Sequence, residues 1–167
     1  MSPPAIFFFS IVASLVLFTH IARWYVMPPL RRLPVERALP PLLLFHCFRY
    51  IGLAFLIPGV VSPSLPAGFA RPAAYGDLLS GVLAYVALLA VRFRWPLAIP
   101  LVWLFNVVGT LDLVNAFIQA ARHGTQPSQL GFMYFIPTLR VPSVYVAHFM
   151  IFVLLLRPSP QPGREAD

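Results

Sequence analysis

No lysine occurs in this chain of 167 residues, and all twelve of its basic residues are arginine. Without lysine there can be no Schiff base to an aldehyde such as retinal, which excludes a retinal-binding rhodopsin. Cys47 is the only cysteine, so neither an intrachain disulfide nor a site with several cysteine ligands can form. Its position inside an apolar run indicates a small buried side chain rather than a reactive thiol.

Charged residues are scarce as well. They make up 10% of the chain, whereas 59% of the residues are hydrophobic and the mean hydropathy is +0.81. An ordinary soluble domain is about one quarter charged. The net charge of +7 would suit nucleic acid, but the arginines lie at the ends of apolar runs, as membrane topology requires. Composition therefore predicts that the partner is the lipid bilayer, with no nucleic acid.

The apolar runs predict an all-α transmembrane bundle of five helices, which forms a single domain over residues 1–157. The five spans cover about residues 5–27, 40–61, 75–91, 97–120 and 140–156, each long enough to cross a bilayer. The first run is too long for a cleaved signal peptide and has no basic residue before it. We expect loops at 28–41 and 62–74, and a disordered cytoplasmic tail at 158–167. The segment 130–139 lies at the interface or dips partly into the membrane.

The arginines also predict the orientation of the bundle. Eight arginines lie in or beside the loop between spans 1 and 2, the loop between spans 3 and 4, and the C-terminus, which share one side of the membrane. Three lie in or beside the loops on the opposite side. The positive-inside rule then places the N-terminus outside and the C-terminus in the cytoplasm.

Polar residues inside the apolar runs are the candidate functional residues, because buried charges in lipid are costly and are usually retained for a purpose. His46 and Arg49 are three residues apart and share one helix face, and Gly52 permits a close approach to that face. The depth of each residue along its span predicts two clusters. The inner cluster contains His20, His46 and Arg49; the outer one contains Asp112, Asn115 and Arg140, with Asp77 at its edge, and Asn106 and His148 lie near mid-depth.

Each cluster allows more than one interpretation. Asp112 and Arg140 form the expected ion pair, which either locks two spans together or belongs to a ligand or proton site that opens outward. Arg49 either extends toward the headgroups or binds an anionic group. His46 and His148 have the residue type needed to ligate a b-type haem from two facing helices, although membrane histidines often only bond to neighbouring groups. The sequence has no cluster of ligands at metal spacing on one helix.

Several segments resemble a group of small, uncharacterised bacterial multi-pass membrane proteins. They are HCFRYIG at 46–52, YGD at 75–77, FNVVGTLDL at 105–113, and the pattern IPT, VP and H within 136–148. The resemblance extends over about residues 42–157. It implies a bacterial inner-membrane location and carries no activity with it.

Three functions remain open at this point, and the sequence does not decide whether the chain is an enzyme. The first is binding of a small ligand, lipid or ion without chemical turnover and without a resident cofactor. Its contact residues would be His46, Arg49, Asn106, Asp112, Asn115, Arg140 and His148. The second is a haem- or quinone-binding subunit of a redox system that uses His46 and His148. The third is a structural subunit of a membrane complex or homo-oligomer, in which buried polar pairs only fix the helix register.

Overall fold

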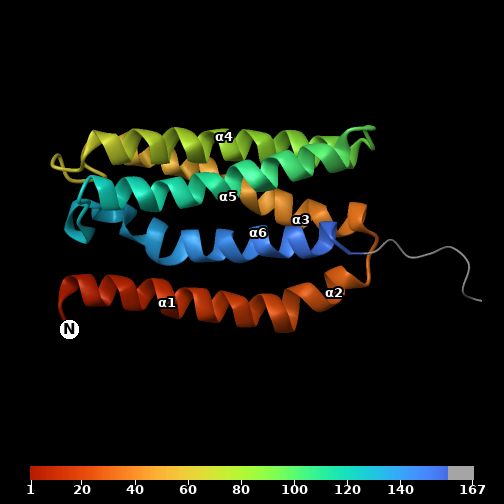
Figure 1. Cartoon of the computed structure of the whole chain (residues 1–167), viewed down its shortest axis with the longest axis horizontal. Helices are drawn as coiled ribbons and strands as arrows, with labels where there is room; N and C mark the ends of the chain where they lie inside the picture. Colours follow the sequence, from red (N-terminus) through yellow and green to blue (C-terminus); the bar gives the residue numbers. More distant parts are fainter. Residues whose placement is uncertain (158–167) are drawn as a thin grey trace, which may run out of the picture.

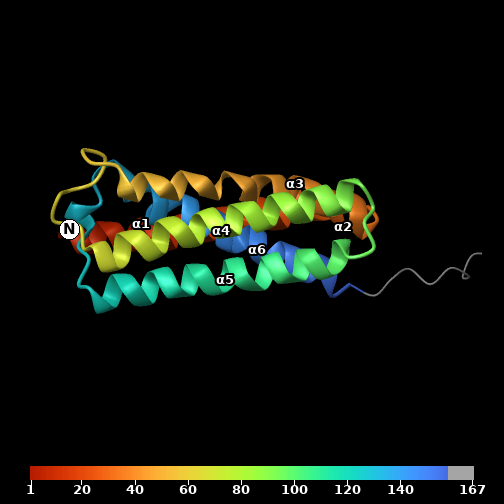
Figure 2. The same ribbon diagram turned by 90° about the horizontal axis from the view of Figure 1, so that it is seen from above.

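The computed structural model of the chain describes residues 1–157, and they form five long helical segments that lie side by side (Figure 1). Each segment is long and apolar enough to cross a membrane. Seen from above, α4 (Ala67–Arg92) lies between α3 (Val35–Cys47) and α5 (Ala98–Arg122), with the other helices beneath them (Figure 2). The predicted all-α fold with five spanning helices is confirmed. The expected tail at 158–167 lies outside the described residues.

The first segment runs from α1 (Pro3–Ile21) through a π-helical turn, η1 (Ala22–Val26), into α2 (Met27–Arg31). It continues beyond residue 27, where the predicted span ended. Pro28 and Pro29 cannot donate to the carbonyls one turn earlier, and the wider π turn absorbs this break in the hydrogen-bond ladder. No residue of α1 is buried, so this helix lies at the edge of the bundle.

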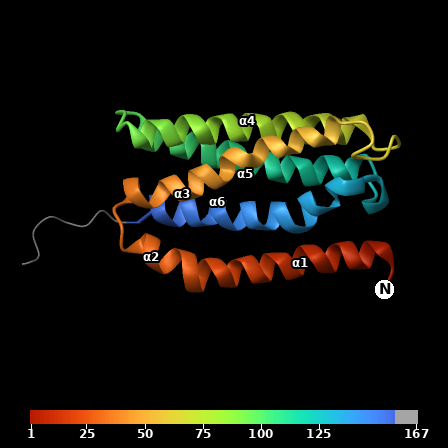
Figure 3. The ribbon, with the colours of Figure 1, turned by 180° about the vertical axis from the view of Figure 1, so that it is seen from behind.

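The second segment joins α3 to a 3₁₀-helix, η2 (Phe48–Leu56). It begins at Val35 instead of residue 40, and Pro40 and Pro41 lie inside α3 rather than in its first turn. A 3₁₀-helix has three residues per turn, so residues three apart are stacked on one face. The buried residues of η2 are Arg49, Gly52 and Phe55, and η2 packs against α4 (Figure 3).

The third segment, α4, begins at Ala67 rather than at residue 75. Asp77 is therefore ten residues inside the helix, about 15 Å from its start, and it does not cap the helix. Ser80, Ala84 and Ala87 are fully buried, as expected for a seam of small residues that permits close helix packing. A short turn around Arg94, with φ 55°, leads into α5.

The fifth segment begins earlier than predicted. Short helices η3 (Pro127–Gln129), η4 (Gly131–Tyr134) and the π-helical η5 (Ile136–Arg140) lead directly into α6 (Val141–Leu155). The segment 130–139 is thus largely helical and belongs to the fifth spanning segment, Gly131–Leu155. Gly131 has φ 54° and lies against the backbone of Val60, whose carbonyl accepts a 3.0 Å hydrogen bond from Phe132 N–H.

Two apolar clusters fill the bundle, and a polar layer separates them. One cluster includes Leu43 of α3, Ala84 of α4 and Phe105 of α5. The other includes Phe55 of η2 and Phe69 of α4. Along each of these helices the polar residues come between the two clusters. The polar layer therefore lies near the middle of the bundle, measured along the helices.

Candidate functional site

The polar layer is organised around the guanidinium of Arg49, which is 3% exposed. Its Nε donates a 2.8 Å hydrogen bond to Asp77 Oδ1, and its Nη2 donates to Asp112 Oδ2. Its Nη1 donates a 3.0 Å hydrogen bond to the Gly109 carbonyl and lies 3.2 Å from His148 Nε2. Four of the five N–H groups that arginine carries are therefore used. We call Arg49, Asp77, Asp112, Asn106 and His148 the Arg49 centre.

Hydrogen bonding within the centre determines the tautomer of His148. Arginine can only donate, so His148 Nε2 must accept, and the ring proton must be on Nδ1. Nδ1 lies 2.7 Å from Asn106 Oδ1, which accepts this proton, while Asn106 Nδ2 donates to the His148 carbonyl at 3.2 Å. His148 is thus neutral, and both of its ring nitrogens are occupied.

Three glycines make room for the functional groups. A Cβ on Gly52 would collide with the Asp77 carboxylate, and a Cβ on Gly76 would collide with that of Asp112. A Cβ on Gly109 would lie 2.6 Å from His148 Cε1 and 3.1 Å from Arg49 Nη1. Each glycine therefore has at least one contact that is too close for a Cβ, and a larger residue at any of the three positions would displace the carboxylate or imidazole beside it.

His46 lies beside the centre but does not join its hydrogen bonds. It is fully buried, and neither ring nitrogen has a partner among residues 1–157. Its ring lies 4.1 Å from that of His148 and 5.0 Å from that of Phe105, centroid to centroid. A haem iron would need a nitrogen of each imidazole on opposite sides of it. Here the rings lie against each other and His148 has no free nitrogen, so these residues do not fit the expected haem site.

Arg140 does not form the expected ion pair with Asp112. Its guanidinium lies over the Phe45 ring, 4.2 Å from the centroid, and its Nη2 donates a 2.9 Å hydrogen bond to the Phe45 carbonyl. Phe45 lies just before α3 changes into η2, where the regular i→i+4 ladder ends. Asp112 bonds to Arg49 instead, and so Arg49 does not extend toward the headgroups.

The expected division into an inner and an outer cluster is also wrong. Because the second segment begins at Val35, Arg49 lies about 21 Å from its start and reaches the same depth as Asp112. His20 stays on α1, where Nδ1 lies 2.9 Å from the Val16 carbonyl. Asn115 accepts a 3.3 Å hydrogen bond from Gln119 on its own helix. Neither residue joins the Arg49 centre.

A cavity of about 110 Å³ is lined by both acidic residues of the centre, Asp77 and Asp112. Its walls are mainly apolar and include Phe7, Phe55, Phe69 and Phe117. It extends from Asp77 and Asp112 toward the end of the bundle that holds the N-terminus (Figure 1). Within the described part of the chain, no group of three potential metal-ligating side chains can hold a metal ion.

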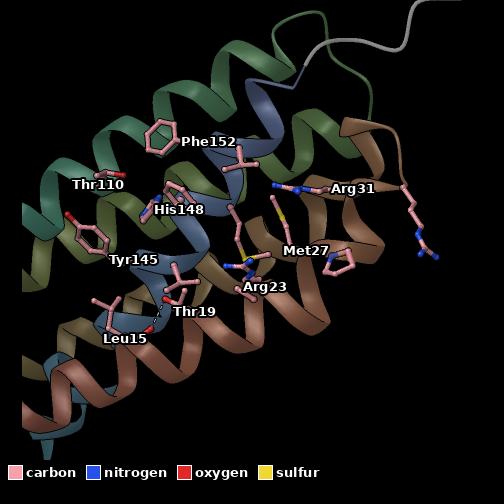
Figure 4. A pocket seen from close by; sticks show the side chains of 16 residues that line it. Leu15, Thr19, Arg23, Met27, Arg31, Thr110, Tyr145, His148 and Phe152 are labelled. Atoms are coloured by element: carbon pink, nitrogen blue, oxygen red, sulfur yellow. Dashed lines mark hydrogen bonds between the residues drawn. The ribbon is translucent and has the colours of Figure 1, made fainter.

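A much larger groove of about 1040 Å³ lies between the first segment and the helices α5 and α6 (Figure 4). His148 lines this groove, while Asp77 and Asp112 line the smaller cavity. Arg49 bonds to all three residues. The Arg49 centre therefore separates two spaces in the bundle.

Five spanning helices around a buried charged centre define a multi-pass α-helical membrane protein. Residues 6–156 match the model of a family described as a domain of unknown function, DUF8737, and the chain belongs to this family. No curated protein and no solved structure matches it.

Proposed function

We propose that this protein binds a small monovalent cation, of the alkylammonium class, at Asp77 and Asp112. The observation that carries the proposal is the cavity of about 110 Å³ that Asp77 and Asp112 both line. Ionisable groups inside a membrane bundle usually mark a ligand or ion site. Binding without chemical turnover suits a centre whose histidine has no free nitrogen for catalysis.

The charges of the centre favour a cation over an anion. Two carboxylates bond to one guanidinium, which leaves one negative charge without an ion-pair partner of its own. Each carboxylate bonds to Arg49 through a single oxygen. The second oxygens, Asp77 Oδ2 and Asp112 Oδ1, lie against Gly52 and Gly76 and have lone pairs that Arg49 does not use. Arg140 also lies near Asp77; its guanidinium is directed at Phe45 and forms no ion pair among residues 1–157, so it offsets this charge only from a distance.

The walls and size of the cavity favour an alkylated ammonium over a hydrated alkali ion. Four phenylalanines line it, and aromatic faces attract ammonium groups that have lost their water. A cavity of about 150 Å³ in another protein holds benzene. A space of about 110 Å³ therefore suits a cation of a few heavy atoms, such as methylammonium or tetramethylammonium.

The membrane and the direction of access belong to the same proposal. We infer a bacterial inner membrane with the N-terminus outside, on the basis of the resemblance and the arginine distribution. In that orientation the cavity extends toward the outer surface, because Phe7 near the N-terminus lines it.

Calorimetric titration of the purified protein in lipid nanodiscs tests the proposal. The titrants are methylammonium, tetramethylammonium, sodium and potassium chlorides at matched ionic strength. We expect saturable heat with an alkylammonium, which the variants Asp77→Asn and Asp112→Asn abolish. Glu36→Gln is the matched control, because it removes an exposed carboxylate that does not line the cavity.

Each of the other outcomes has a definite meaning. If folded protein binds none of these cations, or binds them equally in Asp77→Asn, the proposal is wrong and the structural function is favoured. If sodium binds and the alkylammoniums do not, the carboxylates form the site but the aromatic walls do not select the ligand. The haem form of the redox function has no such support, because His46 and His148 do not fit a haem.

A further inference from the structure

We propose that the groove beside α1 binds one anionic phospholipid, with its phosphate at the arginines of the first segment and an acyl chain along α6. The inference does not depend on cation binding at the Arg49 centre, since none of the lining residues is shared with the smaller cavity. Three features of the groove support it, namely its lateral access, its charge and its length.

The groove is accessible to lipid because α1 is loosely attached to the bundle. None of its residues is buried, and its main contacts with the other spanning segments are to α6 and η5. Figure 4 shows the first segment on one side of the groove and α6 on the other, with Met27 and Phe152 among the lining side chains. An acyl chain entering from the bilayer would meet a predominantly apolar surface there.

One end of the groove is basic. Arg23, Arg31 and Arg32 line it, and none of them forms an ion pair with a carboxylate of residues 1–157. In Figure 4 the side chains of Arg23 and Arg31 reach into the space between the first segment and α6. Guanidinium groups recognise phosphate through paired hydrogen bonds, so this end suits the headgroup of an anionic lipid.

Contacts with the end of α6 hold the basic end in place. Arg157 donates hydrogen bonds of 2.6 Å to the Arg31 carbonyl and 2.8 Å to the Leu33 carbonyl. These bonds join the end of the fifth segment to the connection between α2 and α3. Arg23 lies within the π turn of η1. The backbone at both Arg23 and Arg31 is therefore held in a defined conformation.

The groove is long enough to hold an acyl chain of one leaflet. Leu15 and Arg31 both line it and are about 24 Å apart along a helix, whereas one leaflet holds about 15 Å of hydrocarbon, half of the core. With the phosphate at Arg31 at the interface, the acyl chain would end near mid-membrane, inside the groove. His148 lines the groove near mid-membrane. Both of its ring nitrogens are already bonded, so its ring carbons face the acyl chain.

Native mass spectrometry with added lipid tests the inference on the full chain in detergent. Phosphatidylglycerol is compared with phosphatidylcholine of identical acyl chains. We expect one phosphatidylglycerol to bind at least tenfold more tightly than phosphatidylcholine, because each arginine near a phosphate surface contributes roughly fivefold. The variant R23Q/R31Q/R32Q should lose at least tenfold in phosphatidylglycerol affinity.

The variant R37Q/R92Q/R94Q is the matched control. It removes the same charge from exposed arginines that do not line the groove, and we expect less than a twofold change. A second variant, Val146→Trp, places an indole in the path of the acyl chain along α6 without changing charge, and should weaken the single tight site at least tenfold. Circular dichroism verifies that each variant is folded.

Two results would overturn the inference. One is an equal loss of affinity in the groove and control variants, which would indicate general attraction between a basic protein and an acidic lipid. The other is full binding to folded Val146→Trp, which would place the lipid elsewhere on the protein.

Discussion

Replacing Arg49 with methionine should destabilise the bundle more than any other single charge removal. The substitution keeps an unbranched side chain of similar length but removes four hydrogen bonds. It leaves the side chains of Asp77 and Asp112, which are only 17% and 12% exposed, without a cation. Loss of one partner from a buried ion pair costs about 3–5 kcal/mol, and we expect a loss of that size in the free energy of unfolding.

The same reasoning predicts a rescue. If the cost comes from unpaired carboxylates, then adding Asp77→Asn and Asp112→Asn to Arg49→Met should recover at least half of it, because replacing a whole buried ion cluster by neutral groups is often nearly neutral. Arg140→Met is the matched control. It removes one hydrogen bond and one cation–π contact, worth about 1–2 kcal/mol together.

Equilibrium unfolding in mixed micelles, followed by circular dichroism, measures these differences. The reasoning is refuted if Arg49→Met costs no more than Arg140→Met. It is also refuted if adding Asp77→Asn and Asp112→Asn to Arg49→Met lowers the free energy of unfolding further. The carboxylates would then stabilise the fold without Arg49.

Three further predictions follow from the centre. Gly109→Ala should lower the free energy of unfolding by about 1 kcal/mol in the same assay, because overpacking of about 1–3 kcal/mol exceeds the gain in helix propensity of about 1 kcal/mol. In Gly68→Ala the Cβ would also collide with a histidine ring, that of His123, but His123 is exposed and can turn away, so this variant should not lose stability. Nitrogen NMR of labelled protein should show His148 neutral and protonated at Nδ1; protonation at Nε2 would contradict the hydrogen bond from Arg49. Asn106→Leu should lower the free energy of unfolding by about 1–3 kcal/mol, because it leaves the Nδ1–H of His148 unpaired. Added haemin should give no reducible bis-histidine Soret band, whereas a band lost on His46→Ala would contradict the packing of the two rings.

Hydropathy predicted the five helical segments, but prolines misled the placement of their ends. The predicted loop at 28–41 contains Pro28 and Pro29, and the predicted second span begins at Pro40 and Pro41. In the structure a π turn absorbs the first pair, and the second pair lies within α3. In lipid a continuous helix satisfies backbone groups that a loop would leave exposed, so proline terminates a membrane helix less often than a soluble one.

The misplaced ends also account for the errors in the site. A second span that begins at residue 40 places Arg49 at too shallow a depth, and a third span that begins at residue 75 places Asp77 at the edge of the outer cluster instead of near mid-membrane. The sequence identified most of the charged residues of the centre but assigned Asp112 to the wrong arginine, because helix periodicity defines faces and not neighbours. Gly76 and Gly109 were the missed signal, since a glycine beside a buried charge can indicate where another side chain must fit.

The distances along the chain within the Arg49 centre impose an order on its synthesis. Asp77 follows Arg49 after 28 residues, Asp112 after 63 and His148 after 99. At roughly 5–20 residues per second, Arg49 is translated several seconds before Asp112. The hairpin of the second and third segments already pairs Arg49 with Asp77 and carries no net charge at that depth. It can therefore enter the bilayer as a neutral unit, and the later helices can join it without exposing a bare guanidinium to lipid.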